Sequence, residues 1–241
     1  RPDAPLRDGV TPPEELGQAV MLDDDVMVAP GVMWGKPTLM RGQLDGEVAV
    51  ERIEEKCTLR HGLVGSAAYR DGDHLVLLTI DAAGAGHAFA MDAAGHFRGD
   101  LGAVELATTT PVAAWTALAM AGPDTLLAAG DGCVLEFARA GAGWRETRRW
   151  RSWGAGETEH FGAVIHISSD AHTLAVTDRD RHRVLCFTPG GGTPRASFGR
   201  CDEAGTDLAT VSAPTTVAVR GERVVVFDAG NQRLVKLISA P

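Results

Sequence analysis

Residues 161–187 read FGAVIHISSDAHTLAVTDRDRHRVLCF, and residues 213–239 read APTTVAVRGERVVVFDAGNQRLVKLIS. Each stretch holds three short segments rich in β-branched residues, and Gly, Asp or Asn separates one segment from the next. Such segments are typical of consecutive antiparallel strands. In both stretches an Asp ends the second segment and an Arg follows five positions later, as Asp178 with Arg183 and Asp228 with Arg233. The recurrence predicts a repeated β unit.

Weaker copies of the same unit precede these two. The third segment recurs as HAFAM from His87 and as CVLEF from Cys133. We count five copies, which start near residues 17, 62, 113, 161 and 213. A period of roughly 40–50 residues that carries four strands is the sequence signature of a β-propeller. No long segment has helical periodicity, and the nearest candidate, Pro13–Met21, would form one helical turn before a strand.

Two stretches of the chain resemble NHL-repeat β-propellers. FGRCDEAGTDLATVSAPTTVAV at 198–219 resembles the outer strand, Gly-rich connector and inner strand of that family, and VFDAGNQRLVKL at 226–237 resembles its Asp-turn-Arg element. The resemblance covers residues 154–241, fits residues 62–152 loosely and fits residues 1–56 by pattern only. It implies an all-β fold, a propeller of four-stranded antiparallel blades that forms one domain over residues 1–241.

The number of blades stays open at this stage. Six blades are common in the family, whereas five are readable here, so a sixth would require that the chain is part of a longer propeller. The last copy stops after its third strand at Ser239. An N-terminal strand such as APLRDG, residues 4–9, would complete this blade and cover two exposed strand edges.

Composition excludes some classes of function. The formal net charge of −9 argues against a nucleic-acid binder, which needs a basic surface to neutralise phosphates. No apolar run approaches the ~18 residues of a membrane span. A cluster of arginines at 145–151 is expected on an exposed edge strand, where charge prevents unwanted pairing. The chain begins without a signal-like segment, which leaves its compartment open, and we favour a secreted or periplasmic location over a cytoplasmic one.

The four cysteines leave two readings open. They form no CxxC motif, which argues against a zinc ribbon. Two disulfides are allowed by the count, and four small buried apolar side chains fit equally well. The residues concerned are Cys57, Cys133, Cys186 and Cys201.

Strand order predicts which face of a propeller carries a site. The first strand of each blade lines the central channel, and the connection into it lies on the same face as the turn between the second and third strands. We call this the inner-strand face. His61 and His160 precede inner strands, and His166 lies within one. Neutral imidazoles from different blades form a natural site for a divalent metal, zinc or calcium, so the metal ligands predicted here are His61, His160 and His166.

Several residues on this face are predicted to contact a substrate. Arg60 offers a positive charge for a carboxylate or uronate, Trp115 offers an apolar wall, and Arg181 and His182 are additional to the repeated pattern. With the two histidines, the predicted contacts are Arg60, His61, Trp115, His160, Arg181 and His182. The repeated Asp–Arg pairs are instead expected to hold each blade together, because they recur from blade to blade.

Two functions follow from these patterns. The first is a binding propeller that takes a peptide, a glycan or a partner domain on the inner-strand face. The alternative is a lyase or hydrolase with a His-bound metal or a His/Arg pair on the axis, as the resemblance to the NHL-type peptide-amidating lyases implies. The histidines would otherwise be solvated loop residues or hydrogen-bonded core residues.

Overall fold

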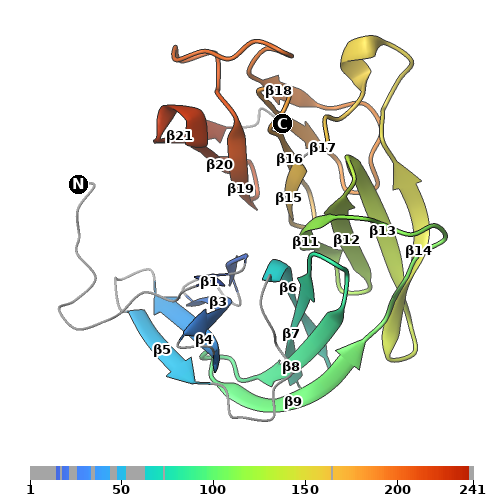
Figure 1. The fold of residues 1–241 in the computed structure, drawn as a ribbon, viewed down its shortest axis with the longest axis vertical. Helices are drawn as coiled ribbons and strands as arrows, with labels where there is room; N and C mark the ends of the chain where they lie inside the picture. Colours follow the sequence, from blue (N-terminus) through green and yellow to red (C-terminus); the bar gives the residue numbers. More distant parts are fainter. Residues whose placement is uncertain are drawn as a thin grey trace. The chain divides into compact units, whose positions relative to one another are not determined.

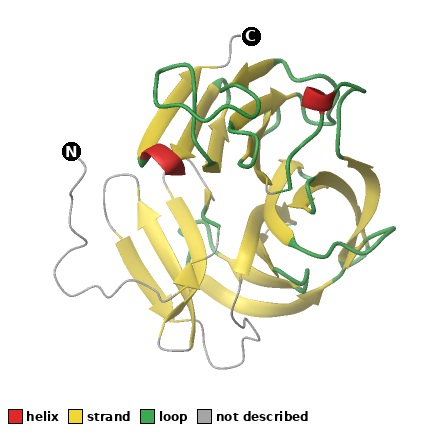
Figure 2. Cartoon of the chain, turned by 45° about the horizontal axis from the view of Figure 1, so that its top comes forward, coloured by secondary structure: helices red, strands yellow, loops and turns green. Residues whose placement is uncertain are grey.

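The computed structural model describes residues 15–16, 18–21, 26–33, 36–43, 48–52, 63–72, 74–163 and 165–238. Within these ranges every regular element is a β-strand except two short 3-10 turns, Glu157–Glu159 and Ala229–Asn231 (Figure 2). The described strands form five sheets. The predicted all-β fold is confirmed, and the sheets are the blades of a β-propeller.

The chain divides into two compact units, the first of which comprises residues 1–81 and 86–103. Its first sheet has the order β1-β3-β4-β5, with β2 paired to β3. The strands are β1 (Glu15–Leu16), β2 (Val20–Met21), β3 (Val26–Met33), β4 (Lys36–Gln43) and β5 (Val48–Arg52). The helical turn predicted at Pro13–Met21 is wrong where this segment is described, since β1 and β2 are extended and pair with β3.

The second sheet of this unit has the order β6-β7-β8-β9. Its strands are β6 (Leu63–Asp71), β7 (His74–Asp81), β8 (Gly86–Met91) and β9 (Phe97–Val104). β7 reads HLVLLTID and is buried on both of its faces, as a near-continuous apolar strand should be. Side chains of both sheets share one apolar cluster, which includes Val28, Leu39, Leu77 and Phe89.

The second unit comprises residues 82–85 and 104–241 and holds three sheets. The first is β10 (Leu106–Ala107), β11 (Trp115–Gly122), β12 (Thr125–Gly130), β13 (Cys133–Ala140) and β14 (Gly143–Trp150). The second is β15 (Ile165–Ser169), β16 (Leu174–Asp178), β17 (Arg183–Phe187) and β18 (Ala196–Phe198). The third is β19 (Pro214–Arg220), β20 (Arg223–Asp228) and β21 (Arg233–Ile238).

Alternation of side chains along β16 explains how these sheets stack. Leu174 and Val176 belong to the apolar cluster shared with the β11–β14 strands, and Ala175 belongs to the cluster shared with β19–β21. Successive residues of a strand point to opposite faces, so a strand covered on both sides must be apolar throughout. The inner strands β11, β15 and β19 consequently lie in succession within this unit (Figure 1).

The predicted strand count per blade is only partly right. The described sheets hold three to five strands rather than four each. The last sheet has three, as expected from a copy that stops at its third strand, and the strand predicted at residues 4–9 lies outside the described residues. The β11–β14 sheet gains a fifth strand, because β10 pairs in parallel with β14. β10 covers β14 only at Trp144 and Arg145, so among the described strands the rest of β14 is an edge, as its arginines predicted.

Candidate functional site

In the three sheets of the second unit, the turn between the second and third long strands is joined by hydrogen bonds to the connection that leads into the inner strand. Asp178 ends β16 and its side chain is 0% exposed. One carboxylate oxygen accepts a hydrogen bond from Arg183 Nε at 2.9 Å, and the other accepts the backbone N–H of Gly162 at 2.9 Å. Arg183 also donates to the carbonyl oxygens of Thr158 and His160. The pair therefore fixes the chain that enters β15.

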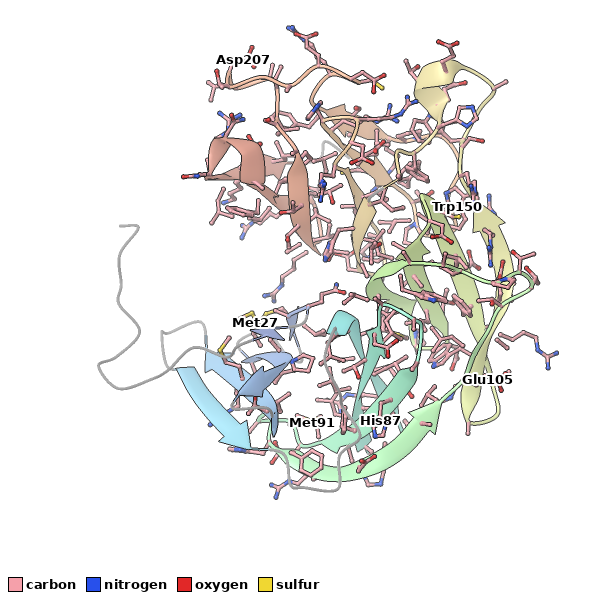
Figure 3. The ribbon with its side chains drawn as sticks, viewed as in Figure 1. Met27, His87, Met91, Glu105, Trp150 and Asp207 are labelled. Atoms are coloured by element: carbon pink, nitrogen blue, oxygen red, sulfur yellow. The ribbon has the colours of Figure 1, made fainter. Side chains whose placement is uncertain are left out.

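The same arrangement recurs one blade later. Asp228 is buried and accepts hydrogen bonds from Arg233 Nε at 2.7 Å and from the Ser212 backbone N–H at 2.7 Å. Arg233 donates to three carbonyl oxygens of the connection before β19, at 2.9, 2.8 and 2.7 Å: those of Thr206, Asp207 and Thr210. Asp207 is labelled in this connection in Figure 3. The structural role predicted for the two Asp–Arg pairs is confirmed.

In the β11–β14 sheet a different residue holds the connection into the inner strand. Gly130 stands where the other blades have Asp, opposite the start of the inner strand. The next residue, Asp131, accepts the backbone N–H groups of Ala113 and Ala114 at 2.7 and 3.0 Å. A carboxylate thus holds each of the connections into β11, β15 and β19, so the starts of these strands are rigid.

The starts of these inner strands surround a pocket of about 140 Å³. The inner strands contribute Thr116, Ile165, His166, Pro214 and Thr215. Thr177 of β16 and Arg179 of the following turn complete the lining. An engineered apolar cavity of about 150 Å³ holds a benzene molecule, so this pocket has room for one small chemical group.

His166 places an imidazole in the pocket. The side chain is half-buried, and Nδ1 is buried with no hydrogen-bond partner. Burial lowers the pKa of His166 to about 4, because the charged ring would lose its solvation. The imidazole is therefore neutral at pH 7.

Arg179 supplies the charge of the pocket. Its side chain is 49% exposed, which places it at the solvent end. Among the residues that the structure describes, its one ion pair is with Asp180, at 3.8 Å from Nε to Oδ1. That separation is too long for a hydrogen bond. Asp180 itself accepts the backbone N–H of Ala163 at 3.1 Å. The Arg179 guanidinium is consequently not committed to holding the fold.

Arg181 and His182 make structural contacts, and His160 is exposed. Arg181 Nη1 donates to the carbonyl oxygen of Glu157 at 2.8 Å and lies 3.3 Å from Cys201 Sγ. His182 has a positive φ of 52°, and its Nδ1 accepts the backbone N–H of Ala213 at 3.0 Å. His160 is exposed and follows the first 3-10 turn. None of these three lines the pocket.

Trp115 is not the exposed apolar wall that its position suggested. The side chain is 5% exposed and contacts Phe137, with ring centroids 6.2 Å apart. Its indole edge lies against Gly84, where an added Cβ would come within 2.3 Å of Nε1. The neighbouring Thr116 lines the pocket instead. Arg60 and His61 lie outside the described residues.

The predicted metal site stays a prediction, because His61, one of its three ligands, lies outside the described residues. Within the ranges that the structure covers, no three His, Cys, Asp or Glu side chains gather as metal ligands would. His160 is exposed and does not line the pocket that holds His166.

Sequence reasoning named one residue of this pocket and missed the rest. Thr116, Thr177, Pro214 and Thr215 are ordinary strand residues, and no motif marks them. The sequence holds one signal for Arg179, which follows the repeated Asp directly and belongs to neither Asp–Arg pair. The cysteine question is partly resolved, because Cys133, Cys186 and Cys201 are free thiols.

Comparisons with known proteins show the fold. No family model matches the chain, and no curated protein matches it. A chain of a nidogen/laminin complex is 15% identical, with a TM-score of 0.57, and the match covers 93% of this chain and 74% of that one. Glutaminyl cyclase from Myxococcus xanthus is 14% identical, with a TM-score of 0.54 and coverage of 94% and 90%. A luciferin-regenerating enzyme is 15% identical, with a TM-score of 0.54 and coverage of 90% and 71%.

At such identities the likeness extends to the fold and not to the chemistry. Among the described residues, no helix is long and apolar enough to cross a membrane. The NHL type stays a prediction, and the chain is a β-propeller by fold.

Proposed function

We propose that the protein is a ligand-binding β-propeller that uses its inner-strand face, with the pocket around His166 as the point of recognition. The observation that carries this proposal is the buried Nδ1 of His166, which has no partner beside a pocket with room for a small group. Buried polar atoms are nearly always paired, and an unpaired one at a pocket calls for an explanation. The carboxylate-held connections support it too, because a rigid site loses little entropy on binding.

The pocket volume limits what enters it. A space of about 140 Å³ takes one side chain, one chain terminus or one sugar substituent, while the remainder of a peptide, glycan or partner domain would lie on the surrounding face. A chain of similar fold occurs in a complex of nidogen with laminin, which is an example of protein binding by this fold.

A catalytic role is the alternative, and the presence of His166 and Arg179 in one pocket favours it. The pKa of His166, lowered by burial to about 4, weighs against it. A general base works best with a pKa near the operating pH, and an imidazole this weakly basic is neither a strong base nor protonated for use as an acid at pH 7. Binding is therefore the better-supported function.

Two adjacent threonines provide the test. Thr215 lines the pocket, whereas Thr216 on the same strand is exposed and does not line it. Saturation-transfer NMR would screen a panel of fragments with about ten or fewer non-hydrogen atoms against the wild type, Thr215→Phe and Thr216→Phe.

We expect fragments that bind the wild type and Thr216→Phe to lose binding to Thr215→Phe, because the new ring occupies the pocket. Melting curves of both variants would establish that they are folded. A panel without hits, or hits that Thr215→Phe retains, would count against the pocket as the binding site.

A further inference from the structure

We propose that the pocket around His166 selects a carboxylate on a small uncharged body, with Arg179 as the partner of the carboxylate. This inference rests on the proposed binding function and adds the chemical class of the ligand. It follows from the distribution of charge and of hydrogen-bond donors between the two ends of the pocket.

The solvent end carries a guanidinium whose donors are largely unused. Arg183 and Arg233 each donate to several backbone carbonyl oxygens and to a buried Asp. Arg179 has only the ion pair with Asp180 at 3.8 Å among its described neighbours. A guanidinium presents five N–H donors in a planar fork that matches a carboxylate, so an incoming carboxylate gains hydrogen bonds that the free protein lacks.

The interior offers no second charge. Thr116 Oγ1 donates to the carbonyl oxygen of Ile165 at 2.6 Å, and Thr177 Oγ1 donates to that of His166 at 3.4 Å. These hydroxyl protons are already used, and Ile165 and Pro214 add apolar surface. The His166 ring is neutral at pH 7, because burial lowers its pKa to about 4. A charged group placed here would lose solvation without an opposite charge to compensate it.

The two ends together define the ligand. One carboxylate lies at the mouth beside Arg179, and an uncharged body of about the size of a benzene ring enters between Ile165, Pro214 and the threonine methyl groups. A dicarboxylate or a cation does not match this arrangement. The C-terminus or acidic side chain of a peptide and a free small organic acid share the required chemistry.

Three probes of the same shape and different charge test the proposal. Benzoate, benzamide and benzamidine would be titrated into the wild type, Arg179→Ala, Arg200→Ala and Thr215→Phe, with NMR to follow binding. Arg200 is a matched control, since it is also exposed and paired with one neighbouring acid, Glu203, but lies away from the pocket lining.

We expect benzoate to bind at least about tenfold more tightly than benzamide, and benzamidine not to bind. Arg179→Ala should weaken benzoate binding about tenfold, which corresponds to about 1.4 kcal/mol, and should leave benzamide binding unchanged. Arg200→Ala should change neither, and Thr215→Phe should abolish both.

The outcomes distinguish failure of the carboxylate proposal from failure of the proposed binding function. Benzamide binding as tightly as benzoate, with both lost in Thr215→Phe, overturns the carboxylate and leaves the pocket as a binding site. Benzoate binding that Arg179→Ala does not weaken also overturns the proposal. Failure of all three probes overturns the carboxylate class, and the fragment screen then decides the binding function by itself.

A peptide pair distinguishes the two sources of a carboxylate. Gly-Gly-Phe with a free C-terminus would be compared with its C-terminal amide. Binding of the free acid tenfold more tightly than benzoate, with loss in the amide, supports recognition of a peptide terminus. Binding weaker than that of benzoate supports a free organic acid.

Discussion

Replacing Asp228 with Ala removes the acceptor at the centre of the connection before β19. The carboxylate is 0% exposed and accepts hydrogen bonds from Arg233 Nε, the Ser212 backbone N–H and Asn231 Nδ2, at 2.7, 2.7 and 2.8 Å. Removing one partner of a buried ion pair typically costs about 3–5 kcal/mol. The Arg233 side chain is 28% exposed and keeps its carbonyl acceptors, so we expect a loss of about 2–4 kcal/mol in the free energy of unfolding.

Urea denaturation followed by circular dichroism would measure this loss, with the melting temperature falling by on the order of 10 °C. The control is Glu203→Ala, because the Arg200–Glu203 pair is 58% and 57% exposed and exposed pairs contribute at most about 1 kcal/mol. The reasoning is refuted if Asp228→Ala unfolds within about 0.5 kcal/mol of the wild type, the range expected of an ordinary surface substitution. Unchanged stability with lost ligand binding would make the pair a recognition element instead.

Three further predictions concern glycine, histidine and cysteine. Gly132 and Gly141 have similar positive φ values of 66° and 62°, but only at Gly132 would a Cβ approach a backbone oxygen, that of Gly162, at 2.5 Å. Gly141→Ala should therefore cost about 1 kcal/mol and Gly132→Ala clearly more in urea denaturation, and equal costs would contradict the steric reading. Because burial lowers the pKa of His166 from 6.5 to about 4, the unfolded chain binds more protons between these pH values, and stability should fall as the pH drops from 6.5 to 4. The difference between the wild type and His166→Gln should change by about 3 kcal/mol over that range, and parallel pH profiles would show that His166 is not desolvated. Burial raises the pKa of the Cys133 and Cys186 thiols, so iodoacetamide at pH 8 should label the partly exposed Cys201 well before either of them, as mass spectrometry would detect.

The repeat was predictable because it rests on local chemistry. β-branched segments separated by Gly, Asp and Asn identify strands and turns within a few residues of each other. The copy starts expected near 62, 113, 161 and 213 lie just before β6, β11, β15 and β19, which begin at Leu63, Trp115, Ile165 and Pro214. The Asp–Arg spacing likewise reflects one turn that both blades share.

Additions to the repeat were not predictable from the same patterns. β10 is two residues long and pairs in parallel with β14, a contact that no alternation of apolar residues signals. The connection that carries it is fixed by Glu146, which accepts the Thr109 backbone N–H at 2.8 Å, and by Arg149, which donates to the Thr110 carbonyl oxygen at 2.8 Å. Arg149 therefore stabilises a connection instead of only decorating an edge.

The pocket was largely hidden for a related reason. Trp115 and Arg181 were predicted from their residue types to contact a ligand. Trp115 instead packs in the core, and Arg181 donates to a main-chain carbonyl oxygen. Burial cannot be read from residue type when the three-dimensional neighbours come from other blades. His166 was identified as a residue of the channel-lining strand, but its lack of a partner at Nδ1 depends on contacts that only the structure gives.

The residues that recur from blade to blade hold the fold, whereas the pocket contains residues that do not recur. His166 pairs with Thr177, the residue before the turn position that Asp178 occupies, and the corresponding inner-strand residues in the other two sheets of this unit are Ala117 and Thr216. Arg179 follows that turn position directly, where the other two sheets of this unit have Asp131 and Ala229. The Asp and Arg residues that recur in two blades hold the connections between strands. His166 and Arg179 occur in one blade only, and the buried Nδ1 of His166 has no hydrogen-bond partner. The buried unpaired nitrogen and the uncommitted guanidinium each leave hydrogen bonds unmade in the free protein, and both belong to residues that line one pocket.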